Sequence, residues 1–501
     1  MSIAGVIAAN RFGLGARPAE VAAISSDPKG WLMAQLAPET ELPVPLRALP
    51  STVDDMSAFF KWLRQIATEA KAQGMDPYAQ TPPGGVAPAA GGMSRDNGFS
   101  IEREYVKAFL PRYATAVKAR FDAAVATDRP FFERLVHFWS NHFVVSGAKA
   151  GAITMPPSFE RDAIRPHVTG RFADMLLASS RHPAMLFYLD NYRSVGPNSK
   201  VGRDPSLRAP RTPQAFAVPQ KAGLNENFAR EILELQTLGV RSGYDQADVT
   251  SFARVLTGWT IAAPPRVPLY KLVLQGRLNA RGLFEFDDEG HEPGPQTIMG
   301  KVYGQSGVDQ GEAVLNDLAR RPATAHFIAT KLARHFIADD PPPAAVARLA
   351  EAFVKSDGDL KEVCAALVQS PEGFDPVPRK FKTPEEYMIS AARALPAFQA
   401  DATSLLRAFG SMGQTPYRPP GPDGWPDVEA EWLGADAIWK RFEWAGQTAQ
   451  RVASTTMNPI ALGKDLFGPQ FSPATEQATA RAQSPAQGLT LLLASAEFQR
   501  R

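Results

Sequence analysis

Residues 225–239 read Asn225-Glu226-Asn227-Phe228-Ala229-Arg230-Glu231-Ile232-Leu233-Glu234-Leu235-Gln236-Thr237-Leu238-Gly239. On a helical wheel the charged side chains of this segment fill one arc, and its apolar side chains lie opposite. Asn225 is a residue type that begins helices, and Gly239 is one that ends them. The segment therefore predicts an amphipathic helix, and segments of this kind decide the fold class.

The same helical pattern recurs on both sides of this segment. Helices are predicted over about 130–145, 171–180, 322–336 and 484–498, and Thr383-Pro384-Glu385-Glu386 forms a capping box at the start of another. Strand-like runs occur only at 269–274, 283–286 and 297–299. The sequence thus predicts a mostly α fold, a multi-helix globular body with one small β-hairpin element around residues 268–303.

The expected organisation has three regions. They are a helical region over 1–262, with a Pro/Gly-rich loop at about 74–98, a small β insert over 263–310, and a second helical region over 311–501. One continuous domain is the alternative, because no fixed-period repeat separates the regions.

Composition excludes several classes of protein. The 501 residues are 44% hydrophobic and 21% charged, which suffices for a sizeable core. Lys+Arg is 54 and Asp+Glu is 52, so the net charge of +2 argues against nucleic-acid binding by bulk charge. The single cysteine, Cys364, excludes a disulfide within the chain and a Cys-based zinc site.

The sequence also bears on location. No apolar run reaches the roughly 18 residues that a membrane span needs, so no integral membrane segment is expected. The apolar run near the N-terminus has no basic residue before it, unlike a secretory signal. We therefore expect a cytoplasmic protein, or a periplasmic one if it is exported together with a partner.

Residues 137–142, His137-Phe138-Trp139-Ser140-Asn141-His142, are the first candidate for chemistry. Glu133, His137 and Asn141 share one stripe of the expected helix, and His142 lies roughly 140° away from it. The two histidines therefore cannot chelate one metal ion from a regular helix. His142 is interpreted as a core residue, whereas His137 is equally compatible with a structural pair with Glu133 and with a site.

The charged arc of 225–239 is the second candidate. A solvated Glu226–Arg230–Glu234 ladder explains it fully. Alternatively, Glu231 and Glu234 line a cleft, where paired carboxylates could hold a divalent cation or act as acid and base.

The turn Asp287-Asp288-Glu289-Gly290-His291-Glu292-Pro293-Gly294 is the third candidate, either a solvated tip or a loop that binds a metal or faces the substrate. Lys331 and His335 share a helix face at i, i+4, and we interpret both as packing or surface residues.

Several of these stretches resemble one bacterial family, called domain of unknown function 1800. They are Ala8-Ala9-Asn10-Arg11-Phe12-Gly13-Leu14-Gly15, the segment 137–143, Asn225–Glu231, Leu256-Thr257-Gly258-Trp259 and His291-Glu292-Pro293-Gly294. The resemblance runs from about residue 6 to the C-terminus. It implies a mostly helical protein without settled biochemistry. It also implies a gene neighbour from a sulfatase-like family, domain of unknown function 1501, whose members are typically exported.

Two positions depart from this family's pattern. Gln236 stands where members usually have histidine, and Ser140 stands where many have histidine. Glutamine is a poor ligand for transition metals, so both departures lower the expectation of a metal site.

The leading hypothesis is a hydrolase-like enzyme with a carboxylate/histidine site, either metal-free or assisted by a divalent metal. Its expected catalytic residues are His137, Glu231, Glu234 and Arg230, and its expected metal ligands are Glu231, Glu234 and His291. The alternative is a non-enzymatic helical scaffold that binds the exported sulfatase-like partner. A third hypothesis is glycan binding by exposed tryptophans such as Trp425 and Trp432.

Overall fold

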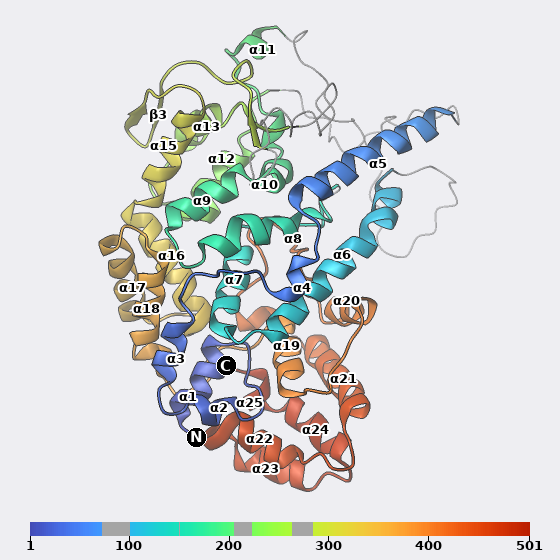
Figure 1. Ribbon diagram of the computed structural model, residues 1–501. Coiled ribbons are helices and arrows are strands. Elements are labelled where there is room, and N and C mark those ends of the chain that lie inside the picture. The colour runs from blue at the N-terminus through green and yellow to red at the C-terminus, as the bar shows by residue number, and fades with distance from the viewer. Residues whose placement is uncertain (73–100, 150, 205–222, 263–283) are drawn as a thin grey trace.

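The computed structural model of this chain describes residues 1–72, 101–149, 151–204, 223–262 and 284–501. Helices make up most of these residues, which confirms the mostly α fold class (Figure 1). The expected loop at about 74–98 and the expected strand at 269–274 lie outside the described residues.

The first half of the chain is helical. Its helices are α1 (Ile3–Ile7), η1 (Ala8–Phe12), α2 (Glu20–Ile24), α3 (Pro28–Ala34), α4 (Val44–Arg47), α5 (Thr52–Ala72), α6 (Ile101–Ala126), α7 (Pro130–His142), α8 (Met155–Phe159), η2 (Glu160–Ile164), η3 (Arg165–His167), α9 (Phe172–Arg181), α10 (Pro183–Tyr188), η4 (Asn191–Arg193), α11 (Lys200–Arg203), α12 (Asn227–Glu231), η7 (Ile232–Thr237) and α13 (Gln246–Val255). The long helices α5 and α6 extend away from the body (Figure 1).

Two small antiparallel sheets follow. β1 (Trp259–Ile261) pairs with β2 (Phe284–Phe286), and Trp259 lies opposite Phe286. β3 (Gln296–Ile298) forms a hairpin with β4 (Lys301–Tyr303). The sequence located β2 and β3 to within about a residue, whereas their partners β1 and β4 were not expected.

The second half returns to helices. They are α15 (Val308–Ala319), α16 (Pro322–Phe336), α17 (Pro343–Lys355), α18 (Leu360–Gln369), η8 (Glu372–Phe374), α19 (Pro384–Ala394), α20 (Ala402–Ser411), η9 (Glu429–Glu431), α21 (Ala435–Val452), α22 (Pro459–Phe467), η10 (Gly468–Gln470), α23 (Pro473–Ala480), α24 (Pro485–Ala494) and α25 (Ala496–Gln499). The single helix expected over 484–498 is two, because Ser495 has extended dihedral angles and caps α25.

Local signals set several helix ends. The capping box of Thr383 and Glu386 forms at α19 as expected. The backbone N–H of Asn227 donates to Oδ1 of Asn225, and Gly239 has a positive φ of 86° after the last turn of η7. The helix expected over 225–239 therefore exists, but its second half, η7, is a π-helix.

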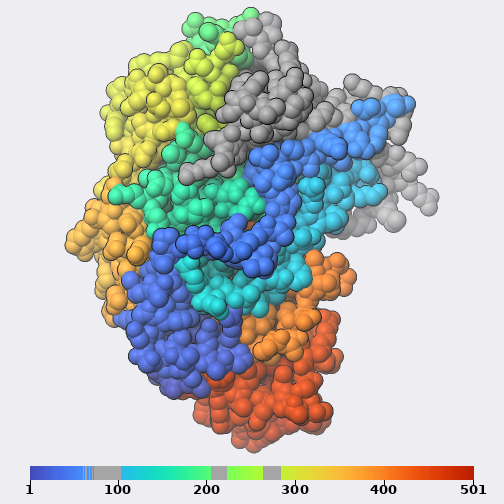
Figure 2. Space-filling model, in the orientation of Figure 1, coloured from blue at the N-terminus to red at the C-terminus, as the bar shows by residue number. Residues whose placement is uncertain are grey.

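One hydrophobic cluster runs through the whole chain, from Val6 to Phe498. Both ends of the chain contribute to one end of the body, since α1 contacts η10 and α2 contacts α22. Figure 2 shows the first and last segments adjoining there. Among the described residues, no helix is both long and apolar enough to cross a membrane.

Candidate functional site

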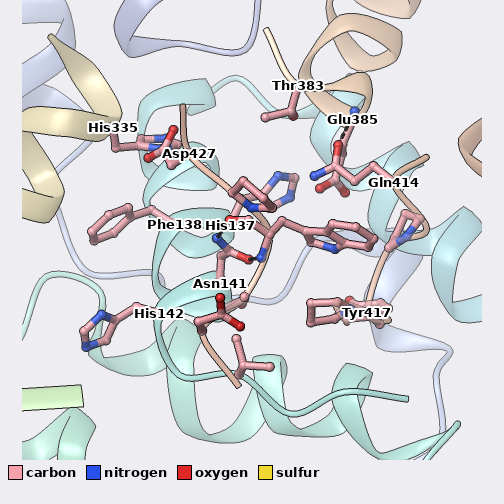
Figure 3. A pocket seen from close by; sticks show the side chains of 18 of the residues that line it. His137, Phe138, Asn141, His142, His335, Thr383, Glu385, Gln414, Tyr417 and Asp427 are labelled. Atoms are coloured by element: carbon pink, nitrogen blue, oxygen red, sulfur yellow. Dashed lines mark hydrogen bonds and ion pairs between the residues drawn. The ribbon is translucent and has the colours of Figure 1, made fainter. Parts of the chain in front are cut away.

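A cavity of about 530 Å³ lies where α7, α16, the start of α19 and the loop 413–428 meet (Figure 3). Its walls combine aromatic rings, such as Phe138 and Tyr417, with many ionisable groups. The ionisable side chains that line it are Arg120, Arg134, His137, His142, Glu160, Lys331, Arg334, His335, Glu385, Glu386, Tyr417, Asp423, Asp427 and Glu431. Such a concentration of ionisable groups around one cavity is typical of a functional site.

His335 and Asp427 form a pair in this cavity. Nδ1 of His335 lies 2.9 Å from Oδ2 of Asp427, and Figure 3 shows the two side chains facing each other. A carboxylate can only accept, so Nδ1 carries the hydrogen and Nε2 keeps its lone pair. Nε2 is buried and has no hydrogen-bond partner among the described residues.

Electrostatics fix the ionisation of this pair. Burial lowers the pKa of His335 below its ordinary value, although Asp427 opposes the shift, so the ring is neutral near pH 7. Burial raises the pKa of Asp427, but His335 and Lys380 lower it more, and this carboxyl stays ionised. Lys380 Nζ lies 3.3 Å from Oδ1 of Asp427. The result is a neutral imidazole held in one tautomer by a carboxylate.

Asn141 holds the loop that carries Asp427. Its Nδ2 donates to the carbonyl of Trp425 at 2.9 Å, and its Oδ1 accepts from the N–H of Trp425 at 2.8 Å. Gly424 permits this approach, because it has a φ of +87° and a Cβ there would lie 2.5 Å from the carbonyl oxygen of Asn141. Trp425, two residues before Asp427, is therefore held against α7.

A buried ion-pair network forms another wall. Arg120 pairs with both Glu160 and Glu385, and Nε of Arg120 lies 2.9 Å from Glu160. Tyr417 donates its hydroxyl hydrogen to Glu160 at 2.9 Å and also packs under the guanidinium of Arg120. Tyr417 has a φ of +61°, a backbone strain that persists only where the surroundings enforce it.

Glu386 joins a second network to the same cavity. Its carboxylate pairs with Arg134 and accepts hydrogen bonds from Arg501 at 2.8 Å and 3.1 Å. Burial raises the pKa of Glu386, but Arg501 and Arg134 lower it well below its usual range. One carboxylate thus pairs with two buried arginines and also caps α19 by accepting from the N–H of Thr383.

His137 lines the cavity, as a site interpretation of this residue requires. Its Nε2 is buried without a hydrogen-bond partner among the described residues and lies 3.8 Å from Oε1 of Glu133. Burial and then Arg120, Arg165 and Arg134 lower the pKa of His137 well below its ordinary value. His137 and Glu133 are too far apart for a hydrogen bond. The carboxylate of Glu133 is bound by Arg165 instead, at 2.6 Å.

His142 is only 2% exposed, and its Nε2 bonds the carbonyl of Gln236 at 3.1 Å. This agrees with its interpretation as a core residue, although its ring reaches the edge of the cavity. Gln236 itself is 4% exposed and supplies a backbone oxygen to that contact.

The charged arc of α12 and η7 is mainly a ladder. Arg230 lies 3.7 Å from Glu226 and 3.2 Å from Glu234, and it also bonds Gln246 of α13 at 2.8 Å. Neither Arg230 nor Glu234 lines the cavity. Glu231 does not line the cavity either, but the charge of Asp423, which does, acts on it: burial, Glu234 and then Asp423 raise the pKa of Glu231 to about 7.

His291 lies apart from the cavity. It is 9% exposed, and its Nδ1 donates to the carbonyl of Thr257 at 2.8 Å. The neighbouring Glu292 accepts from the N–H of Asn198 at 2.8 Å, so this turn fixes the chain rather than standing free in solvent. Within the described part of the chain, no three His, Cys, Asp or Glu side chains are grouped as a metal site requires. The expected ligand set of Glu231, Glu234 and His291 therefore has no geometric support.

The two tryptophans proposed for glycan binding are not an exposed pair. Trp432 is 6% exposed and donates from Nε1 to the carbonyl of Pro426 at 3.0 Å. Trp425 packs against it, with ring centroids 6.2 Å apart, and lines the cavity.

Sequence reasoning missed His335 and Asp427 as site residues. The i, i+4 spacing of Lys331 and His335 was a usable signal, since both side chains line the cavity. Asp427 gave no such signal, because it follows a Pro/Gly-rich loop and meets a helix 92 residues away.

The family model described as "Protein of unknown function (DUF1800)" matches residues 7–500, which is nearly the whole chain. No curated protein and no solved structure matches it.

Proposed function

The chain belongs to the DUF1800 family of proteins of unknown function, and from the geometry of its cavity we propose a hydrolase-like enzyme in which His335 is the general base. One observation carries the proposal: His335 lines a cavity rich in ionisable groups, bonds Asp427 through Nδ1 at 2.9 Å, and has a buried Nε2 with no hydrogen-bond partner in the described part of the chain. This is the arrangement by which a carboxylate orients an imidazole for proton transfer.

The proposed chemistry follows from these ionisation states. Neutral His335 takes a proton from water at Nε2 as the water oxygen bonds to an electrophilic centre of the substrate. The bond from that centre to the leaving group breaks, and the imidazolium returns the proton to the leaving group. Asp427 stabilises the imidazolium that forms, and Asn141 keeps Asp427 in place through the loop. His137, also neutral, is the second candidate for proton transfer from α7.

This proposal assigns no metal ligand, because the described residues contain no group of three suitable side chains. Glu231 lies outside the cavity lining and is assigned no ligand role. Arg230 ties α12 to Gln246 of α13 and to Glu234 of η7, and neither Arg230 nor Glu234 is given a part in the chemistry.

The test compares the parent protein with His335→Gln and Asp427→Asn. The probes are four p-nitrophenyl compounds: the acetate ester, the phosphate ester, the sulfate ester and the β-glucoside. We expect the parent to hydrolyse at least one probe, and each variant to lose about 100-fold or more in kcat/KM. The parent rate should fall as pH drops through the lowered pKa of His335, because the protonated ring cannot act as a base.

The matched control is His326→Gln, since His326 is an exposed histidine on the same helix. It should keep the parent rate. Full activity in His335→Gln would overturn the assignment of the base, and a parent that hydrolyses none of the four probes would count against hydrolysis.

A helical scaffold is the second candidate function. It is supported by apolar exposure on α21, where Trp439 is 62% exposed and Phe442 is 43% exposed. The partner would be the sulfatase-like protein encoded next to family members, and the chain would reach the periplasm together with it. Co-purification with that gene product, lost in Trp439→Ser, is the expected result. A protein that stays monomeric when both are produced together would contradict it.

A further inference from the structure

Lys331 is an unpaired cation in the same cavity. It lies one helical turn before His335 on α16, so the two side chains share a face. Within the described residues, Lys331 Nζ makes no ion pair or hydrogen bond, and its one aromatic contact is the ring of Phe327 at 5.6 Å. Arg120 and Arg134, by contrast, are both paired with carboxylates.

The surroundings of Lys331 keep part of its amine neutral. Burial lowers the pKa of Lys331 to about 8, Arg334 lowers it further, and Asp427 and Asp423 oppose the shift. His142 also faces this cation, since the charge of Lys331 contributes to the lowered pKa of that ring. At pH 7 about one molecule in ten carries the unprotonated amine, compared with well under one in a thousand for an ordinary lysine.

The charges around Lys331 select the class of ligand. An anion bound to its ammonium group would also meet the negative fields of Asp423 and Asp427. A cation would be repelled by Lys331 itself. A neutral molecule with a carbonyl group meets neither penalty, and an uncharged, partly desolvated lysine amine is a nucleophile for carbonyl carbon.

We propose that Lys331 is a Schiff-base site for a neutral aldehyde or ketone, with His335 as the neighbouring proton carrier. The amine nitrogen forms a bond to the carbonyl carbon, and the carbonyl oxygen takes a proton to give a carbinolamine. The carbon–oxygen bond then breaks, water leaves, and the nitrogen has given up both its protons to become the imine. This site goes beyond the proposed hydrolysis and does not depend on it, because it requires no activated water.

The experiment traps the imine. The full chain is treated at pH 7 with propionaldehyde and sodium cyanoborohydride for short times, and modified lysines are located by peptide mass spectrometry. The internal reference is Lys361, an exposed lysine on α18. We expect Lys331 to be modified about ten-fold or more faster than Lys361, with a rate that saturates as the aldehyde concentration rises.

Two variants and one competitor complete the test. Lys331→Arg keeps the charge and should lose this fast modification, whereas Lys361→Arg should leave the modification of Lys331 unchanged. Equal rates at Lys331 and Lys361 in the parent would overturn the proposal. Protection of Lys331 by acetate would also overturn it, because it would make the residue an anion site. Trapping is read on the parent protein itself, so loss of hydrolysis in the His335 variant leaves its outcome intact.

Discussion

At the scale of single residues, burial sets the ionisation state of the cavity histidines. The pKa values of His137, His142 and His335 are all lowered, in each case by burial before any other cause. Only His335 has a carboxylate within hydrogen-bond distance of its ring, at 2.9 Å. The three histidines are therefore neutral near pH 7, and His335 alone is both neutral and oriented by an acidic partner.

Glu231 gives a prediction at this scale. Its pKa is raised from 4.5 to about 7 by burial, Glu234 and Asp423. Between these two pH values the unfolded chain loses the proton that the folded chain keeps, so the stability that this group contributes falls as pH rises. Glu231→Gln removes this fall. We expect the difference in unfolding free energy, variant minus parent, to be roughly 1 kcal/mol larger at pH 8 than at pH 4. This figure is discounted because the side chain is only half-buried.

Urea denaturation at the two pH values measures this difference. Glu443→Gln, at an exposed position on α21, is the matched control and should show no such change. A parent–variant difference that is the same at pH 4 and pH 8 would rule out the raised pKa.

At the scale of elements, the cavity depends on how a loop docks on a helix. The loop 413–428 has no helix of its own before η9, and contacts with several neighbouring elements hold it, among them α6 through Tyr113, η2 through Glu160 and α7 through Asn141. Asn141 supplies two of these contacts through Trp425, and Gly424 supplies the room for them. Proline and glycine break local structure here, and tertiary contacts, including those of Asn141, then fix the geometry.

We predict that Asn141→Ala weakens this docking. Both hydrogen bonds to Trp425 are lost and leave its backbone groups unpaired, which costs about 1–3 kcal/mol of unfolding free energy. Asp427 should then move away from His335, because it follows Trp425 by two residues. Chemical denaturation measures the first effect. The pH titration of His335, followed by NMR of histidine ring carbons, measures the second.

Asn316→Ala is a suitable control, since the side chain of Asn316 donates to a carbonyl of its own helix, that of Glu312. It should leave the titration of His335 unchanged. If Asn141→Ala lowers stability but the His335 titration stays that of the parent, Asn141 has no positioning role.

At the scale of the whole molecule, the two halves of the chain share one core. The hydrophobic cluster extends from Val6 to Phe498, and the cavity draws its walls from both halves. The last residues join in as well: Arg501 bonds Glu386, and Phe381 pairs with Arg500 across a β-bridge. The sequence left two interpretations open, three regions divided at 262 and 310 or one continuous domain. The shared core favours the single continuous domain.

This shared core predicts one cooperative unfolding transition. Far-ultraviolet circular dichroism and tryptophan fluorescence should lose their native signals with the same midpoint in urea, because neither half can open without exposing the common core. Large chains often unfold through intermediates, so the comparison is informative. Two separated midpoints would favour independent regions with a boundary near 262–310.

The accuracy of the sequence predictions varies with the range of the interaction behind each feature. The helices at 225–239 and 322–336 were predictable, because their caps and apolar faces depend on residues a few positions apart. The π-helical turn of η7 was not, since no local pattern in 232–237 distinguishes it from an α-helix. Of the expected catalytic residues, only His137 lines the cavity. Arg230 instead pairs with Glu234, in the ladder that was the alternative to a site.

The sequence by itself therefore determined the helical class, the capping box at Thr383 and the charged ladder of α12. Each arises from contacts between neighbours along the chain, and these form in any helix of that sequence. Only the tertiary structure decided that Asp427 meets His335, that Glu386 joins Arg134 to Arg501, and that Lys331 pairs with no carboxylate of the described residues. Each of these outcomes depends on which charged groups from distant segments meet in the interior. For a buried group, the partner it meets sets its ionisation state, and the residue type alone does not.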